Sequence, residues 1–244
     1  MQSTVTEKPK DSEADRQPLV QVQELSRSIK SDGQETVILE SISFEVQPRA
    51  LFAVNGPSGS GKSTLLNLLT GIDRPTSGHV TFGGEKVGAK SEDQLARWRG
   101  RNVGIVFQFF QLIPTLTALE NVTLALELGG AHRFARKLWR ERGLECLRTA
   151  GIAELADRLP SAVSGGQQQR IAIARAIAND PPAIVADEPT GNLDSRSAAQ
   201  VFETRAGLVD LGKTVIYVTH DAQLAARASA GIELLDGRIV ARHP

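Results

Sequence analysis

Apolar residues along the chain form two kinds of run, one that alternates with polar residues and one that is nearly continuous. Val20 and Val22 alternate with glutamines from about residue 19 onward, and residues 42–46 repeat this alternation. A period of two predicts strands with one buried face. Residues 50–54 are almost entirely apolar, which predicts a strand buried on both faces, as in a parallel sheet.

The same continuous pattern returns at residues 183–186 and 214–219, and each of these runs adjoins a helical pattern. Strands that alternate with helices predict an α/β fold. Between residues 110 and 183 we expect no strong strand. Thr117 and Glu120 instead have the spacing of a capping box, with apolar residues following at helical spacing, and a second helix is expected over residues 134–150. The middle of the chain, at about residues 100–163, therefore reads as a helical insertion into an α/β core.

Charge and composition narrow the classes of protein further. Residues 1–18 are rich in charge and contain no aromatic residue, so we expect a disordered tail followed by one folded domain from 19 to 244. The 28 Lys+Arg balance the 28 Asp+Glu, and this zero net charge argues against a general nucleic-acid-binding protein. The only cysteine, Cys146, excludes an intrachain disulfide and is expected to be a small buried hydrophobe.

No stretch of the sequence predicts a membrane span or a secretory signal. The longest run without a charged residue, 102–119, contains too many polar residues to cross a bilayer, and the N-terminus has no apolar core of a signal peptide. Any membrane role would therefore need a separate partner chain.

A glycine-rich segment follows the buried strand at residues 50–54. It matches the phosphate-binding pattern G-x-x-x-x-G-K-S/T and consists of Gly56, Pro57, Ser58, Gly59, Ser60, Gly61, Lys62, Ser63 and Thr64. Glycines let backbone N–H groups surround a polyphosphate, and a helix that begins near Gly61 points its positive end at the anion. Lys62 would neutralise the β/γ oxygens, and the Ser63 hydroxyl would ligate Mg²⁺. The flanking strand and apolar helix favour this interpretation over a Gly/Ser-rich surface loop.

Two carboxylates and a histidine also follow apolar strands. Asp187 and Glu188 directly follow the strand at residues 183–186. There Asp187 can reach a Mg²⁺ ion, and Glu188 can act as general base toward water. Alone, the pair would be read as a helix cap or loop. His220 follows residues 214–219 and could hydrogen-bond a γ-phosphate, although a lone histidine after a strand is more often structural.

A second candidate anion site begins a helix that we expect to reach about Asn179. It consists of Ser164, Gly165, Gly166 and Gln167. Serine and glycine are also ordinary helix caps, so both interpretations stay open. Because a chain with one phosphate-binding loop has little use for a second phosphate site of its own, this segment would serve a nucleotide held by another subunit.

These pieces, in this order, resemble the ATP-binding cassette (ABC) ATPase family. The resemblance covers about residues 19–240 and adds a Q-loop at 106–108, a signature at 163–167, a Walker B strand at 184–188 and a D-loop at 192–194. Residues 106–122 and 186–194 look like the subgroup of lipoprotein-releasing, macrolide-exporting and cell-division ATPases (LolD-, MacB- and FtsE-like). The resemblance implies a P-loop NTPase (RecA-like) core with an antiparallel β subdomain and an inserted helical subdomain.

The resemblance also implies a mechanism and partners. Two chains, expected to be identical, would pack head to tail with two ATP between them, each ATP lying between one phosphate-binding loop and the partner's signature. Gln108 would join Mg²⁺ and water and couple the site to the membrane partner, and Asp194 would contact the opposite subunit. Glu188 would be the base and His220 would hold the γ-phosphate. The partner would be an integral membrane permease of the FtsX or MacB kind, with the ATPase at the cytoplasmic face of the membrane and no nucleic acid involved.

Two departures from the family pattern and one apolar segment complete the sequence picture. Val163 stands where the signature usually has leucine. No aromatic residue occurs from 19 to 43, and Ile29 aligns with the position where the family stacks adenine on an aromatic ring. The apolar residues that follow Gln108 (Phe109, Phe110, Leu112 and Ile113) are either core packing or a permease contact.

Two other functions are compatible with parts of this pattern. A soluble ABC ATPase acting on DNA or the ribosome would usually have two cassettes or long coiled-coil insertions, and a P-loop kinase would leave the signature and His220 unexplained.

Overall fold

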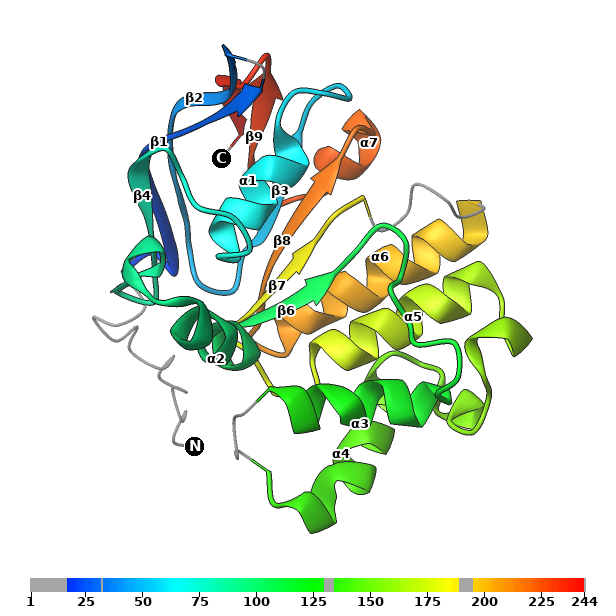
Figure 1. Cartoon of the computed structure of the whole chain (residues 1–244). Helices are drawn as coiled ribbons and strands as arrows, with labels where there is room; N and C mark the ends of the chain where they lie inside the picture. Colours follow the sequence, from blue (N-terminus) through cyan, green and yellow to red (C-terminus); the bar gives the residue numbers. More distant parts are fainter. Residues whose placement is uncertain (1–16, 32, 130–133, 189–194, 244) are drawn as a thin grey trace, which may run out of the picture.

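The computed structural model describes residues 17–31, 33–129, 134–188 and 195–243, and arranges them as two sheets with helices around them (Figure 1). The larger sheet has the strand order β10-β9-β3-β8-β7-β6. Its parallel strands are β3 (Leu51–Asn55), β6 (Val103–Val106), β7 (Ala183–Ala186), β8 (Thr214–Thr219) and β9 (Ala230–Leu235), and β10 (Arg238–His243) runs antiparallel to β9. Residues 183–186 and 214–219 are fully buried, as the continuous apolar runs predict.

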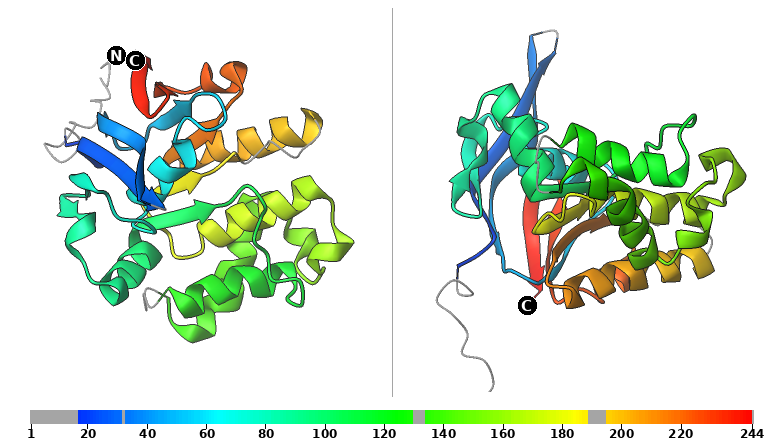
Figure 2. Two further views of the ribbon diagram at one scale, coloured as in Figure 1. Left: turned by 45° about the horizontal axis from the view of Figure 1, so that its top comes forward. Right: turned by 90° about the horizontal axis from the view of Figure 1, so that it is seen from below.

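The smaller sheet is antiparallel, in the order β2-β1-β4-β5. It consists of β1 (Val20–Ser31), β2 (Gln34–Val46), β4 (Ser77–Phe82) and β5 (Glu85–Lys86). The alternating residues Val20, Val22, Ile42, Phe44 and Val46 are all buried, in one hydrophobic cluster with the leucines of α1 (Lys62–Leu69) and the facing residues of the larger sheet. Helix α1 thus lies between the two sheets (Figures 1 and 2).

The remaining helices surround a second hydrophobic cluster on the other side of the larger sheet. They include α3 (Ala118–Leu128), α4 (Trp139–Thr149), α5 (Gly165–Ala176) and α6 (Ser195–Asp210), while α2 (Glu92–Asn102) precedes β6 and the short α7 (Ala222–Ala225) follows β8. Helices α3, α4 and α5 contact one another, and α5 also contacts β6 and α6. Helices α3 and α4 lie between β6 and β7 in sequence, and the predicted fold class is confirmed.

Two helix boundaries differ from the sequence prediction. The helix expected from residue 134 begins at Trp139, after a 3₁₀ turn at Arg136–Leu138, and the Trp139 indole N–H donates to the Phe134 carbonyl oxygen at 3.0 Å. Helix α5 ends at Ala176 rather than near Asn179. Residues 177–179 form a turn, and Arg142 of α4 donates to the carbonyl oxygens of residues 177 and 178. The expected tail at residues 1–18 lies almost wholly outside the described residues.

Candidate active site

The predicted site residues gather at one edge of the larger sheet because they follow neighbouring parallel strands. The phosphate-binding loop follows β3, Gln108 follows β6, the acidic pair follows β7 and His220 follows β8. These four strands are adjacent in the order β3-β8-β7-β6 (Figure 1). The carboxyl ends of parallel strands meet at one edge, which is where α/β sheets usually bind ligands.

The backbone of the phosphate-binding loop requires glycine at two closely packed positions. Gly56 has φ 150°, and a Cβ there would lie 2.2 Å from the carbonyl oxygen of Leu234. Gly61 has φ 97°, and its Cβ would lie 2.9 Å from the carbonyl oxygen of Ile38. Helix α1 begins at the next residue, Lys62, so its unpaired N–H groups open into the loop. The loop therefore has the backbone shape that a polyphosphate requires.

Lys62 lies inside this loop rather than extending into solvent. It is buried, and its Nζ donates to the carbonyl oxygens of Gly56 at 2.8 Å and Pro57 at 2.7 Å. Among the described residues no carboxylate forms an ion pair with it, and the nearby buried Ser60 hydroxyl has no hydrogen-bond partner. A buried cation whose hydrogen bonds within the described residues go only to backbone carbonyl oxygens fits an anionic ligand.

Ser63 and Asp187 bring two oxygens together beside the loop. The Ser63 hydroxyl donates to Asp187 Oδ1 at 3.2 Å. Burial raises the pKa of Asp187 and the nearby Glu188 carboxylate raises it further, while the Ser63 hydrogen bond and Lys62 act in the opposite direction. A bound divalent cation would offset this unfavourable burial of charge, and hydroxyl and carboxylate oxygens are suitable ligands for Mg²⁺.

The described residues contain no cluster of three or more His, Cys, Asp or Glu side chains that could cage a metal. The hydroxyl and carboxylate oxygens of Ser63 and Asp187 suit a Mg²⁺ ion held jointly with phosphate oxygens, which is the usual arrangement for this ion.

Glu188 is held between the two remaining candidate catalytic residues. Its Oε1 lies 3.2 Å from Nδ1 of His220 and its Oε2 accepts from Gln108 Nε2 at 3.4 Å. The Glu188 side chain is 18% exposed and that of His220 is 57% exposed. Glu188 has φ 37°, in the left-handed region that costs non-glycine residues of order 1–3 kcal/mol and that often marks functional positions. The structure thus brings Gln108, Glu188 and His220 together, as the sequence predicts.

The second predicted phosphate site is not part of this cluster. Ser164 caps α5 in a capping box with Gln167, whose backbone N–H donates to the Ser164 hydroxyl at 3.3 Å. Ser164 is exposed, and among the described residues no hydrogen bond connects this segment to the phosphate-binding loop. Ser164 therefore caps its own helix, whereas binding of a nucleotide held by another subunit stays a prediction. Asp194 lies outside the described residues.

Ile29 lies on β1 opposite Thr36, and 46% of its surface is exposed. Its side chain is therefore available to a ligand. Its assignment to the adenine stays a prediction.

Sequence reasoning missed two residues that hold the segment after Gln108. Asn121 is buried on α3, and its side chain accepts from the Ile113 N–H at 2.8 Å and donates to the Ile113 carbonyl oxygen at 3.1 Å. Arg175 of α5, whose pKa is lowered by burial, donates to the carbonyl oxygen of Phe110 at 2.7 Å and to that of Gln111. The signal in the sequence that could have identified Asn121 was its position as a lone asparagine beside the apolar stripe of α3.

The apolar residues of the same segment divide between two environments. Phe109 is 68% exposed, and Ile113 is also exposed. Phe110 and Leu112 pack against the second hydrophobic cluster. No helix in the described ranges has the length and apolarity required to cross a membrane.

Comparison with known proteins gives consistent matches. A sequence profile of the ABC transporter family matches residues 39–191. The macrolide export ATP-binding/permease protein MacB of Burkholderia pseudomallei is 44% identical over 223 residues, which are 91% of this chain but only 34% of that protein, so the chain spans about a third of the length of this relative. The lipoprotein-releasing system ATP-binding protein LolD 1 of Chlorobium chlorochromatii is 44% identical over 217 residues, 88% of this chain and 85% of that protein.

A solved structure has the same fold. The ATP-binding cassette MJ0796, in a dimeric post-hydrolysis state bound to ADP and Pi, superposes with a TM-score of 0.84 at 38% identity, over 92% of this chain and 97% of that one. The family profile covers more than half of the chain, and the LolD relative is matched over most of its own length. The chain therefore belongs to the ABC transporter family and is one of its ATPase cassettes.

Proposed function

We propose that the chain binds and hydrolyses ATP as the nucleotide-binding subunit of an ABC transporter-type membrane complex, in which ATP-driven head-to-tail dimerisation powers a separate permease. The observation that carries this proposal is the placement of Glu188 between Gln108 and His220, beside the Ser63–Asp187 pair. One cluster thus combines a candidate base, a candidate metal site and a phosphate-binding loop.

Each site residue has a role in this proposal. Residues 56–64 surround the polyphosphate, and Lys62 exchanges its two backbone carbonyl partners for β/γ oxygens. Mg²⁺, when bound, neutralises charge on the phosphate oxygens. Ser63, Asp187 and Gln108 would hold this ion. Glu188 takes a proton from the attacking water, and His220 holds the γ-phosphate.

The signature segment would complete the site of a second subunit, which we expect to be an identical chain. Ser164 is exposed. Its N–H donates to Gln167 Oε1 and its hydroxyl accepts from the Gln167 N–H, so among the described residues only the hydroxyl proton is left to donate to a neighbouring molecule. Gly165, Gly166 and Gln167 would contact the partner's nucleotide together with Ser164, and Asp194 would contact the opposite subunit. The dimeric state named for MJ0796 supports this arrangement.

A groove between α2 and α3 supports docking of a permease. This α2–α3 groove has a volume of about 390 Å³, and its lining includes Arg99 and Gly100 of α2, Leu124 and Leu128 of α3, and Ile113. Leu128 is 75% exposed and Ile113 is 37% exposed. An apolar groove with exposed aliphatic side chains suits an amphipathic helix. We infer that it receives a cytoplasmic helix of an FtsX- or MacB-like permease, which would hold this chain at the cytoplasmic face of the membrane.

The competing functions leave more of the structure unexplained. A P-loop kinase has no use for the Gln108–Glu188–His220 cluster or for the signature. An ABC ATPase acting on DNA or the ribosome would not need the apolar α2–α3 groove. Cell fractionation separates these possibilities, because a transporter subunit should sediment with membranes only when its permease is present.

Replacement of Glu188 by glutamine tests the catalytic assignment. Glutamine keeps the shape of the side chain but removes the proton acceptor, while Lys62 and the Mg²⁺ ligands remain. We expect hydrolysis to fall roughly 10²–10⁴-fold and an ATP-bound dimer to accumulate on size-exclusion chromatography. A Glu188→Gln protein that stays monomeric with ATP, or hydrolyses it at the wild-type rate, would contradict the proposal.

A further inference from the structure

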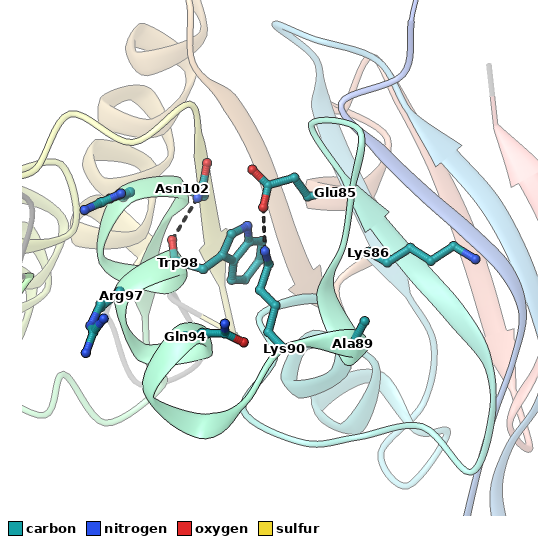
Figure 3. A pocket seen from close by; sticks show the side chains of 9 residues that line it. Glu85, Lys86, Ala89, Lys90, Gln94, Arg97, Trp98 and Asn102 are labelled. Atoms are coloured by element: carbon teal, nitrogen blue, oxygen red, sulfur yellow. Dashed lines mark hydrogen bonds and ion pairs between the residues drawn. The ribbon is translucent and has the colours of Figure 1, made fainter.

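A hollow lined by basic side chains lies on the other side of α2 from the α2–α3 groove. This basic pocket has a volume of about 740 Å³ and is formed by β5, the turn that follows it and α2. Its basic residues are Lys86, Lys90, Arg97 and Arg101, against a single acidic residue, Glu85. Figure 3 shows Trp98 at its centre, with Arg97 extending from α2 on one side and Lys86 extending on the other.

Three of these four cations have no partner in the described structure. Lys90 is neutralised by Glu85, with 2.6 Å between Nζ and Oε2. Lys86, Arg97 and Arg101 are all exposed, and no ion pair or hydrogen bond of their side chains occurs within the described ranges. Arg97 and Arg101 are four residues apart on one helix, where like charges repel each other. An anionic partner would relieve this repulsion.

Trp98 gives the basic pocket an aromatic centre. The residue is 5% exposed, and its ring packs edge-on against Phe82 with 5.3 Å between centroids. Its indole N–H has no hydrogen-bond partner in the part of the chain that the structure describes, whereas the Trp98 carbonyl oxygen accepts from Asn102. Trp98 therefore forms a buried apolar floor of the basic pocket, and the exposed cations stand beside it.

The basic pocket and the α2–α3 groove lie on opposite sides of one helix, which is about 10–12 Å across, so a membrane near the groove would also be near the pocket. Arg97, Trp98 and Arg101 line the basic pocket, while Arg99 and Gly100 of the same helix line the groove. If a permease helix occupies the groove, as in the function proposed above, α2 lies close to the membrane surface. Arg97 and Lys86 extend away from the hollow on opposite sides (Figure 3), which suits several headgroups in a plane rather than one small enclosed anion.

We propose that the basic pocket binds the phosphate-bearing headgroups of anionic phospholipids in the cytoplasmic leaflet, and that it orients the ATPase beside its permease. This inference rests on the proposed permease-coupled function. Arginine guanidinium groups bind phosphate through two parallel hydrogen bonds, and juxtamembrane Lys and Arg side chains are attracted to anionic leaflets. Three unpaired cations predict weak binding that high salt abolishes.

Vesicle flotation of the full chain tests the proposal. We expect the protein to bind vesicles of phosphatidylcholine mixed with phosphatidylglycerol and not vesicles of phosphatidylcholine alone. The double variant Arg97→Ala/Arg101→Ala should reduce the bound fraction roughly tenfold or more. The matched control is Arg140→Ala/Arg148→Ala, which removes two exposed arginines from α4 and should bind like the wild type.

Three outcomes would overturn the proposal: equal binding to both kinds of vesicle, wild-type binding by the Arg97/Arg101 variant, or an equal loss in the control. A different result would be that the wild-type chain binds no vesicles and the Arg97/Arg101 variant no longer co-purifies with the permease in detergent. That result would assign the basic pocket to an acidic segment of the permease and overturn the proposal. ATP hydrolysis by the soluble variants, measured in parallel, keeps these failures distinct from a failure of the proposed ATPase function. The Arg97/Arg101 variant should hydrolyse ATP at the wild-type rate.

Discussion

Ile29 stands at the position that is predicted to contact the nucleotide base, where the family usually has an aromatic residue. Its exposed aliphatic side chain on β1 can make van der Waals contact with a base but cannot stack on it as an aromatic ring does. Stacking of a base on an aromatic side chain is worth about 1–3 kcal/mol. The expected consequence is a base pocket that discriminates poorly between ATP and GTP.

Substitution of Ile29 by tyrosine should therefore tighten ATP binding several-fold, as measured by fluorescence titration of the isolated chain. Val37→Tyr is a matched control, because Val37 is an exposed aliphatic residue of the neighbouring strand β2, 57% exposed. Unchanged affinity in the Ile29 variant would mean that position 29 does not contact the base.

Cys146 should be chemically inert in the folded protein. It is fully buried on α4, and burial raises the pKa of its thiol to about 11. At pH 8 about one thiol in a thousand would then be ionised, and the thiolate is the reactive form. We expect a thiol reagent such as DTNB to label the native protein only as fast as it unfolds, and to label it at once in guanidinium. Rapid labelling in native buffer would show that α4 opens locally.

At the scale of elements, the helix start that a capping box specifies was predicted from the sequence, whereas boundaries without such a local signal were not. Thr117 and Glu120 identified the start of α3, and both reciprocal hydrogen bonds are present, at 2.8 and 3.2 Å. A capping box is contained within four residues, so the sequence alone specifies it. Just beyond the end of α5, by contrast, Arg142 reaches from α4 to the carbonyl oxygens of residues 177 and 178. No local pattern encodes that contact.

The site shows the same division between local and tertiary information. The position of the candidate site residues was predictable because motifs follow strands, and parallel strands bring their carboxyl ends together. Asn121 and Arg175 were not predicted, since their role is to hold the backbone of residues 110–113 across helix boundaries. The basic pocket was also missed, because it forms only when the β4–β5 hairpin and α2 pack together.

The segment after Gln108 permits a sharper test of the permease groove than the sequence allowed. Leu112 packs against the core, so Leu112→Asp would destabilise the fold, whereas Ile113 is exposed in the α2–α3 groove. We expect Ile113→Asp to preserve ATP binding and to abolish co-purification with the permease. Leu211→Asp is a control that places the same charge on another exposed leucine, beyond the end of α6. Wild-type co-purification of a folded Ile113→Asp protein would place the docking surface elsewhere.

At the scale of the whole molecule, one chain contains both segments that are predicted to form an ATP site but keeps them on separate structural elements. The phosphate-binding loop opens from α1 between the two sheets, while the signature caps α5 within the helical cluster. In the proposed head-to-tail dimer each site takes its phosphate-binding loop from one chain and its signature from the other. Activity would then depend on pairing rather than on either chain alone.

Mixing two inactive variants tests this dependence on pairing. Ser164→Arg should leave ATP binding nearly intact but stop hydrolysis, because the arginine blocks the partner's phosphate site, and Lys62→Ala removes the phosphate-binding cation. A mixed dimer contains one site with both defects and one site with none. If chains exchange at random and sites act independently, an equal mixture should recover about a quarter of the wild-type ATPase rate.

The control is Ser164→Arg mixed with Ser164→Arg/Lys62→Ala, in which every site lacks a normal signature and no recovery is possible. Failure of the first mixture to recover activity, once mixed dimers are demonstrated, would mean that Ser164 does not act on the partner's nucleotide.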